Sequence, residues 1–335
     1  MESFKFLQNA KKTFPITGLK HCKWKSYYVI ILAILAIFVT SCEDPAPMDY
    51  IQDCYIEGYL LAGEPITGFR VTYTQPLDQP FSVKNGNITD ASVKIICYKG
   101  YTDSIEQVLT LAYKQDDSLA QKSGFYSDPG FKIKPLTKYR LEININDNEK
   151  TRITGLTYVP DSISWIKPPK DTINYPKDTN ALPVDNNLEI EWRRVNSTMA
   201  YILCTDCLDT VGYGKYLSPP TAERNRPVYN FITNQMSKRQ DTARPSYYKE
   251  KTWVGMIRNT HTQTVWMAFK WFGPHLVSVY APDFNMLRWF FASMYGGQNY
   301  GITNSVKSEN GKRAFGVFGS ASVVRHYLFM KKNQP

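Results

Sequence analysis

The sequence predicts a mainly β protein built from two antiparallel β-sandwich domains of the immunoglobulin-like type, the second with one helix. Short segments rich in β-branched and aromatic residues alternate between apolar and polar positions over most of the chain. Asn, Asp, Gly and Pro separate these segments, as hairpin turns require. Only residues 282–295 show convincing helical spacing. Many short strands without intervening helices indicate sandwiches rather than a parallel sheet.

Residues 1–41 have the layout of a secretory signal peptide. A lysine-rich start precedes the apolar run from Tyr27 to Val39. This run is shorter than the ~20 apolar residues that a spanning helix needs. Small residues followed by Cys42 resemble the bacterial lipobox, in which the cysteine becomes the lipid-modified (for example palmitate-bearing) first residue of the mature protein. The alternatives are an ordinary secretory leader and an uncleaved membrane anchor.

Residues 42–50 read as a lipidated tether, because the prolines after the anchor disfavour a packed element. Glu43 and Asp44 resemble the export signal that sends Bacteroidota lipoproteins to the outer face of the outer membrane; a generic solvated tether is the alternative. We therefore expect a lipid-anchored protein of the outer membrane, exposed at the cell surface. More than one acyl chain is needed for stable anchoring.

The first sandwich is predicted over residues 51–160. Leu136 to Tyr139 precede an alternating strand and are similar to the tyrosine corner of immunoglobulin-like domains. Turns are expected at Asn85-Gly86, Asp128-Pro129-Gly130 and Asp147-Asn148. The predicted strands are Cys54 to Leu61, Phe69 to Tyr73, Ala91 to Tyr98, Gln107 to Tyr113, Lys138 to Ile145 and Arg152 to Val159.

A linker rich in Pro, Asp, Lys and Thr is predicted over residues 161–187, before a second mainly β domain over 188–335. Residues 217–251 are polar and basic, typical of a solvated loop or of a binding loop on a rigid scaffold. The helix near 282–295 is bounded by Pro282, Asp283 and Gly296-Gly297. The strands expected here are Leu188 to Trp192, Met199 to Cys204, Thr264 to Phe272 and Leu276 to Tyr280.

The net charge of +10 overstates any affinity for polyanions. Removal of residues 1–41, with six lysines and one glutamate, leaves a net charge of +5. Residues 42–160 carry −4 and residues 161–335 carry +9, and this asymmetry favours two domains. Nucleic acid is not expected as a partner outside the cytoplasm, and an anionic partner surface or lipopolysaccharide suits the basic half better.

Four cysteines of the mature chain permit two disulfides outside the cytoplasm. We predict Cys54 with Cys97, and Cys204 with Cys207. The C-x-x-C spacing of the second pair also occurs in redox and zinc sites. However, the histidines supply no paired zinc ligands, and no helix follows the motif to lower a thiol pKa. No metal or cofactor is therefore expected.

Six Asp-Ser/Thr-aliphatic triplets match the acceptor motif of Bacteroidota O-glycosylation. Ordinary turn chemistry is the alternative reading of each triplet. The candidate acceptors are Ser104, Ser118, Ser162, Thr172, Thr210 and Thr242.

Signatures of common enzymes are absent from the sequence, including a nucleophile elbow, a Walker loop and H-E-x-x-H. Asp116-Asp117 and Glu189 with Glu191 are paired carboxylates of the kind that glycosidases use. Such neighbours on a loop or strand are more often solvated surface. We expect no catalytic residue, and a hydrolase is retained as an alternative.

Four segments carry a resemblance to a known family: the lipobox, Glu57-Gly58-Tyr59-Leu60, the stretch from Val279 to Asn285 and the stretch from Gly316 to Ser322. Together they resemble the Bacteroidota lipoproteins with domain of unknown function 4249. Members of that family are often associated with TonB-dependent transporters. The resemblance implies a non-catalytic accessory or binding subunit for a glycan or other nutrient, with no catalytic residues to transfer. A structural or adhesion module of the envelope is a further alternative.

Overall fold

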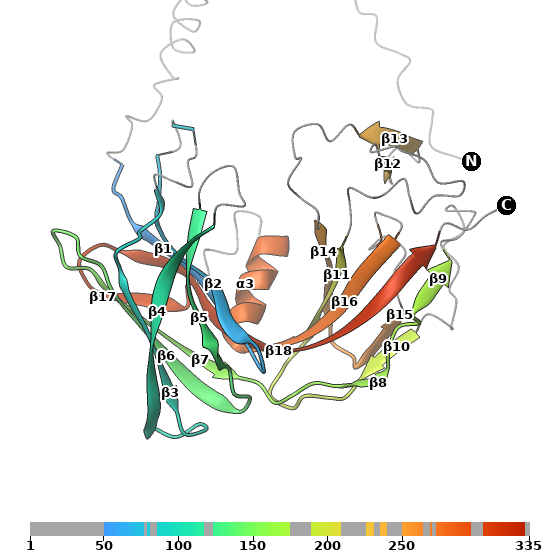
Figure 1. Ribbon diagram of the computed structural model, residues 1–335, viewed down its shortest axis with the longest axis horizontal. Coiled ribbons are helices and arrows are strands. Elements are labelled where there is room, and N and C mark those ends of the chain that lie inside the picture. Colours follow the sequence, from blue (N-terminus) through green and yellow to red (C-terminus); the bar gives the residue numbers. More distant parts are fainter. Residues whose placement is uncertain are drawn as a thin grey trace, which may run out of the picture. The chain divides into compact units, whose positions relative to one another are not determined.

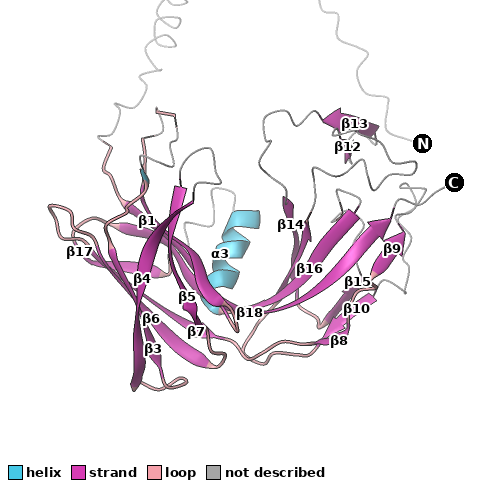
Figure 2. Cartoon of the chain, viewed as in Figure 1, coloured by secondary structure: helices cyan, strands magenta, loops and turns pink. Residues whose placement is uncertain are grey.

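The computed structural model is mainly β, as predicted, and contains the expected helix (Figures 1 and 2). The chain divides after Ile51, and all elements discussed below lie in the unit Gln52–Pro335. No helix in the described ranges is long and apolar enough to cross a membrane. The structure describes residues 50–76, 79–80, 86–116, 123–174, 189–208, 226–230, 235–239, 250–263, 269, 273–295 and 304–331.

Seven strands follow one another in the first half of this unit. Four of the six predicted strands match within two residues at each end, Gln107 to Tyr113 lies inside a longer strand, and Phe69 to Tyr73 forms the second half of another. They are β1 (Cys54–Leu61), β2 (Pro65–Tyr73), β3 (Ser92–Tyr98), β4 (Ile105–Asp116), β5 (Ser123–Lys132), β6 (Thr137–Asn144) and β7 (Arg152–Val159).

In the described residues, the second half adds shorter strands, one helix and an 18-residue strand. The helix α3 (Phe284–Tyr295) agrees with the prediction for 282–295. The strands are β8 (Trp165–Lys167), β9 (Thr172–Asn174), β10 (Glu189–Trp192), β11 (Tyr201–Cys207), β12 (Arg226–Asn230), β13 (Gln235–Arg239), β14 (Glu250–Ile257), β15 (His261–Gln263), β16 (Gly273–Pro282), β17 (Val306–Asn310) and β18 (Ala314–Lys331).

Strand β18 belongs to both predicted domains. Its residues 314–321 pair in parallel with β1, and residues 321–330 pair antiparallel with β16. A 13-stranded sheet results, in the order β14-β11-β16-β18-β1-β2-β5-β4-β3-β6-β7-β17, with β9 also beside β18. The β1–β18 and β9–β18 pairs are parallel, so the prediction of purely antiparallel pairing is wrong at these two places. Figure 1 shows β18 in red, running from one set of strands to the other.

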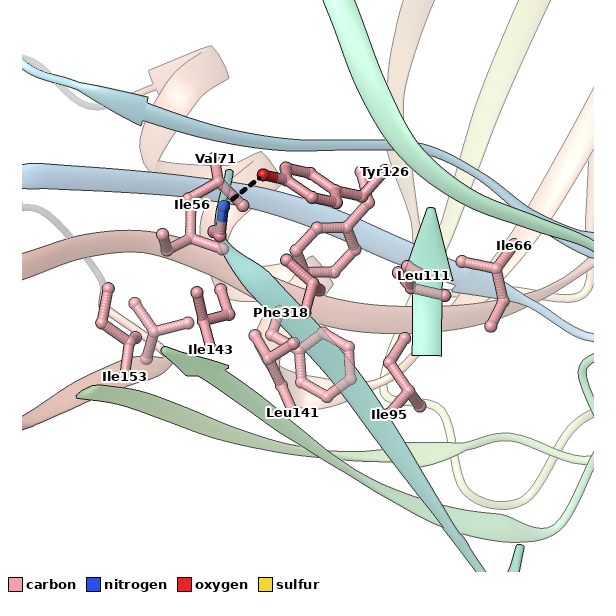
Figure 3. Packing of buried hydrophobic residues seen from close by; sticks show 14 of the residues in the cluster. Ile56, Ile66, Val71, Ile95, Leu111, Tyr126, Leu141, Ile143, Ile153 and Phe318 are labelled. Carbon is pink, nitrogen blue, oxygen red and sulfur yellow. Dashed lines mark hydrogen bonds between the residues drawn. The ribbon is translucent and has the colours of Figure 1, made fainter. Parts of the chain in front are cut away.

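The first hydrophobic core lies between the strands of residues 54–159 and the start of β18. Strand β1 alternates buried and half-buried positions, which is the pattern of a strand with one face in a core. Figure 3 shows Phe318 of β18 among Ile95, Leu111 and Leu141. In the same view the hydroxyl of Tyr126 accepts a hydrogen bond from the backbone of Ala91 at 2.9 Å. The buried phenol is thereby satisfied without leaving the core.

A second core forms around Trp192, which is fully buried. Two of its members, Ile163 and Ile173, come from the predicted linker 161–187. Strand β8 pairs with β10 and strand β9 with β18, so the described part of this segment is structured. Three-residue strands between prolines carry too little alternation to be recognised from sequence.

Each half has a tyrosine that fastens a strand to the preceding turn. The Tyr139 hydroxyl accepts a hydrogen bond from the backbone N–H of Lys134 at 2.8 Å, which confirms the predicted tyrosine corner. The Tyr201 hydroxyl accepts one from the backbone N–H of Val195 at 2.8 Å, an equivalent contact that was not predicted from the sequence. Two such corners beside separate cores agree with an immunoglobulin-like arrangement in each half.

Two predicted turns and one predicted loop differ in how far the structure agrees with them. Asp128-Pro129-Gly130 lies inside β5 rather than in a turn, where β2 pairs with β5 through register shifts. Lys150 N–H bonds to the Asp147 carbonyl at 3.1 Å, as expected for the Asp147-Asn148 turn. The basic segment 217–251 contains the β12–β13 hairpin. Asn85 and all of the predicted strand 264–272 except Phe269 lie outside the described residues.

Candidate functional site

One face of the sheet β14-β11-β16-β18 gathers aromatic and charged side chains. Alternation along the strands sends Leu203 and Val279 into the second core, and their neighbours to the other face. Strand register aligns these neighbours in three rows: Met256, Ile202, Tyr280 and Val323; Trp253, Cys204, Ser278 and Arg325; Lys251, Asp206, Leu276 and Tyr327. We call the second and third rows, with the Tyr280 hydroxyl, the Trp253 surface.

Helix α3 packs on the first row. Met286 and Phe290 of the helix form a buried cluster with Ile202 and Tyr280. Trp253 lies at the border of this cluster, with ring centroids 5.7 Å from Tyr280 and 5.3 Å from Phe290. It is 36% exposed, whereas Tyr280 is 4% exposed. The indole is therefore held in place from one side and open to solvent on another.

Lys251 connects the aromatic rings to a carboxylate. Its Nζ donates to the Tyr280 hydroxyl at 3.2 Å and lies 3.7 Å from Asp206 Oδ2. The same ammonium is 5.0 Å from the centroid of the Trp253 ring, a cation–π distance. Burial opposes the charged form, but Tyr280, Cys204 and Asp206 together raise the pKa of Lys251. The lysine is thus a cation at neutral pH.

Arg325 occupies the opposite side of Tyr280. Its guanidinium forms an ion pair with Glu64, which follows β1, and it also hydrogen-bonds the Tyr280 hydroxyl. Asp206, Lys251, Tyr280, Arg325 and Glu64 therefore form one chain of polar contacts across the sheet. Each of its two cations has a carboxylate beside it, so the chain is close to neutral.

The prediction of a Cys204–Cys207 disulfide in the C-x-x-C motif is contradicted. Cys204 and Cys207 are both buried thiols on β11, and no disulfide joins them. Residues three apart on a strand point to opposite faces and are separated by ~10 Å, beyond disulfide reach. Burial raises the pKa of the Cys204 thiol to about 12. This thiol, which belongs to the Trp253 surface, therefore stays protonated at neutral pH.

The prediction of a Cys54–Cys97 disulfide is also contradicted. Both residues are buried thiols of the first core, on β1 and β3, which are not neighbours in the sheet. Burial raises the pKa of Cys54 to about 12. The two residues act as small apolar side chains in the packing.

Asp283 is a buried carboxylate, 7% exposed, and it caps α3. Its Oδ1 accepts hydrogen bonds from the backbone N–H groups of Met286 (2.8 Å) and Ser320 (3.1 Å). Its Oδ2 accepts one from the Thr157 hydroxyl at 2.6 Å. Burial raises the pKa of Asp283 despite these bonds. The residue therefore joins α3, β7 and β18, which is a structural role.

The candidate glycosylation residues that the structure describes are accessible. Ser104, Ser162 and Thr172 are exposed. Ser118, Thr210, Thr242 and the lipidation residue Cys42 lie outside the described residues.

The structure describes three of the four paired carboxylates. Glu189 and Glu191 lie on β10, and Glu189 faces Lys167 at 3.3 Å. Asp116 ends β4, and Asp117 lies outside the described residues. Within the described ranges, no cluster of His, Cys, Asp and Glu could hold a metal ion.

The sequence did not indicate that Trp253, Asp206, Arg325 and Tyr327 share one surface, because they come from strands far apart in sequence. Their common signal is two polar or aromatic residues that lie two positions apart on one strand, as Lys251 and Trp253 do on β14 and Arg325 and Tyr327 on β18. That signal identifies a face only after the pairing of the strands is known.

Comparison with known proteins gives one family. None of the curated proteins searched matches the chain. The family model described as a domain of unknown function, DUF4249, matches residues 47–270, which include Lys251, Trp253, Cys204 and Asp206. The chain therefore belongs to the DUF4249 family.

Proposed function

We propose that the protein is a non-catalytic binding subunit, anchored in the outer membrane by lipid on Cys42 and exposed at the cell surface. The leader, the cysteine at its end and the acidic tether support the anchoring. An accessory role beside a TonB-dependent transporter follows from the resemblance described above.

The Trp253 surface is the observation that carries the binding role. Trp253 and Lys251 are partly exposed on a paired strand, and Tyr280 beneath them is fixed by packing under α3. Binding sites need side chains whose positions are set before the ligand arrives. Exposed groups on a multi-stranded sheet meet that requirement better than groups on a loop.

The partner is tested by detergent extraction of the tagged native lipoprotein from its own outer membrane. Mass spectrometry of the purified complex should identify a β-barrel transporter in stoichiometric amount. Recovery of the lipoprotein alone, after mild extraction and after chemical cross-linking in whole cells, would contradict the accessory role. A Cys42→Ser variant serves as the anchoring control, and we expect it to be released from the membrane fraction.

A further inference from the structure

We propose that the Trp253 surface binds a neutral oligosaccharide. This inference rests on the proposed binding role and names its ligand class.

Trp253 provides a stacking platform for a sugar ring. One part of the indole is packed against Tyr280 and Phe290, and the remainder is exposed. The C–H face of a pyranose is apolar and flat, and it suits a rigid aromatic surface whose orientation costs little entropy on binding. Tyr327 on β18 provides a second exposed aromatic side chain, with 70% of its surface accessible.

The polar groups around Trp253 suit hydroxyl groups. The ammonium of Lys251 and the guanidinium of Arg325 donate, the carboxylates of Asp206 and Glu64 accept, and each hydroxyl of a sugar can do both. Charged groups form the stronger hydrogen bonds of this kind. A sugar edge can therefore be bound without leaving one of these charges unpaired.

The balance of charges argues against an anionic ligand. Lys251 is paired with Asp206, and Arg325 with Glu64, so the described residues of the surface leave no surplus cation to neutralise a phosphate or a carboxylate. An apolar ligand would bury these charges without compensation, which is costly. A neutral, hydroxyl-rich ligand needs no surplus cation, and its hydroxyl groups can form hydrogen bonds with the charged groups that it covers.

The distance between the two aromatic side chains points to an oligosaccharide. Trp253 lies on β14 and Tyr327 on β18, separated by β11 and β16. Three strand spacings amount to about 14 Å. This span exceeds one sugar ring, and Lys251, Asp206 and Leu276 share the row of Tyr327 along it. The ligand would cross the strands, with its two ends on the aromatic side chains.

The test uses the full lipidated protein in a detergent without a sugar head group, such as a dodecyl polyoxyethylene ether. Isothermal titration calorimetry measures binding of maltohexaose, cellohexaose, xylohexaose and mannohexaose, with glucose as the short probe and hexagalacturonate as the anionic probe. The variants are Trp253→Ala and Tyr327→Ala. The control is Tyr158→Ala, which also removes an exposed aromatic side chain but lies on β7, outside the Trp253 surface. Urea unfolding of each variant checks its fold.

We expect at least one neutral hexasaccharide to bind more tightly than glucose, and each site variant to weaken this binding at least tenfold. Tyr158→Ala should change it less than twofold. Tyr327→Ala keeps the test valid if Trp253→Ala fails to fold, since Tyr327 is the more exposed residue. No binding of any neutral hexasaccharide, binding of hexagalacturonate alone, or unchanged binding by both variants would overturn the proposal.

The outcome is separable from that of the partner experiment. Recovery of a barrel with both wild-type and Trp253→Ala protein, without sugar binding, would reject the ligand class and leave the accessory role intact. Sugar binding that depends on Trp253, without a barrel, would reject the accessory role and keep the ligand.

Discussion

Gly316 pairs with Ile56 so closely that a side chain at position 316 has no room. A Cβ there would lie 1.9 Å from the carbonyl oxygen of Ile56, and the backbone has φ +126°. The contact lies in the parallel β1–β18 pair that joins the first core to the strand shared by both halves. Glycine is therefore required by both conformation and space.

Gly316→Ala should lower the free energy of unfolding by about 3 kcal/mol or more, because the new methyl group meets fixed backbone. Gly63→Ala is the matched control, since Gly63 also has a positive φ (+79°) but nothing within 4 Å of its Cβ. It should cost about 1 kcal/mol. Urea unfolding followed by circular dichroism measures both, and equal losses would show that the close contact does not matter.

Asp283 supports the second prediction. Asp283→Ala removes the acceptor for two backbone N–H groups and for Thr157, so it should cost about 2 to 4 kcal/mol. Asp283→Asn keeps an oxygen acceptor and avoids burying a charge, so it should cost less than half as much. Asp128→Ala, at a partly exposed carboxylate that accepts a hydrogen bond from the Gly130 N–H at 3.0 Å, is the control at about 0.5 kcal/mol. A larger loss with Asn than with Ala would contradict the capping role.

The pH dependence of Asp283 follows from the direction of its pKa shift. The pKa of Asp283 is raised in the folded protein. At pH values between its unfolded and its folded pKa, the folded state therefore holds a proton that the unfolded state has already released. This group therefore contributes stability that is present below its ordinary pKa and is lost as pH rises through the folded pKa. The Asn variant should lack this component in unfolding curves between pH 3 and pH 7.

The two tyrosine corners test whether the halves unfold together. Tyr139→Phe and Tyr201→Phe each leave one backbone N–H, of Lys134 or Val195, without its hydroxyl acceptor. Each should cost about 1 to 2 kcal/mol. Because β18 is shared, we expect both variants to lower the midpoint of the same calorimetric transition. Two transitions, each shifted by one variant only, would show independent domains instead.

Local sequence patterns predicted most of the individual strands and the helix, but they did not predict which distant strands pair with each other. The alternation of β1 and the Pro282-Asp283 start of α3 are local signals, and both elements appear at the expected residues. Strand β5 was missed because Asp128-Pro129-Gly130, a turn signal, lies within it. The sharing of β18 depends on the match between Ile56 and Gly316, which are 260 residues apart, and no local pattern records such a match.

The four buried thiols make a further prediction. The mature protein, with Cys42 blocked by lipid, should show no reaction with Ellman's reagent when folded and about four reactive thiols after denaturation without reductant. Buried, protonated thiols react only on unfolding, whereas two disulfides would give no thiols under either condition. Denatured samples treated with reductant supply the reference count.

His275 makes the final prediction, on acid sensitivity. It is 1% exposed, and its Nδ1 lies 2.9 Å from the Gly273 carbonyl oxygen, which can only accept, so Nδ1 carries the proton. Burial lowers the pKa of His275 to about 4 from an ordinary value of 6.5. Above pH 6.5 the ring is neutral in both folded and unfolded states. Between pH 6.5 and pH 4 only the unfolded state binds a proton at this residue. The free energy of unfolding therefore falls by about 3 kcal/mol as the pH is lowered across this range.

His275→Asn removes the titrating group and keeps an N–H donor for the Gly273 carbonyl. It should lower stability at pH 7, through lost packing against Phe269, but reduce the loss between pH 7 and pH 4 by about 3 kcal/mol. Urea unfolding at both pH values measures this difference directly. His326→Asn is the matched control, because that ring is partly exposed and pairs with Asp171 at 2.9 Å on the surface. If His275→Asn and wild type lose the same stability on acidification, burial of the neutral imidazole is not the source of the acid sensitivity.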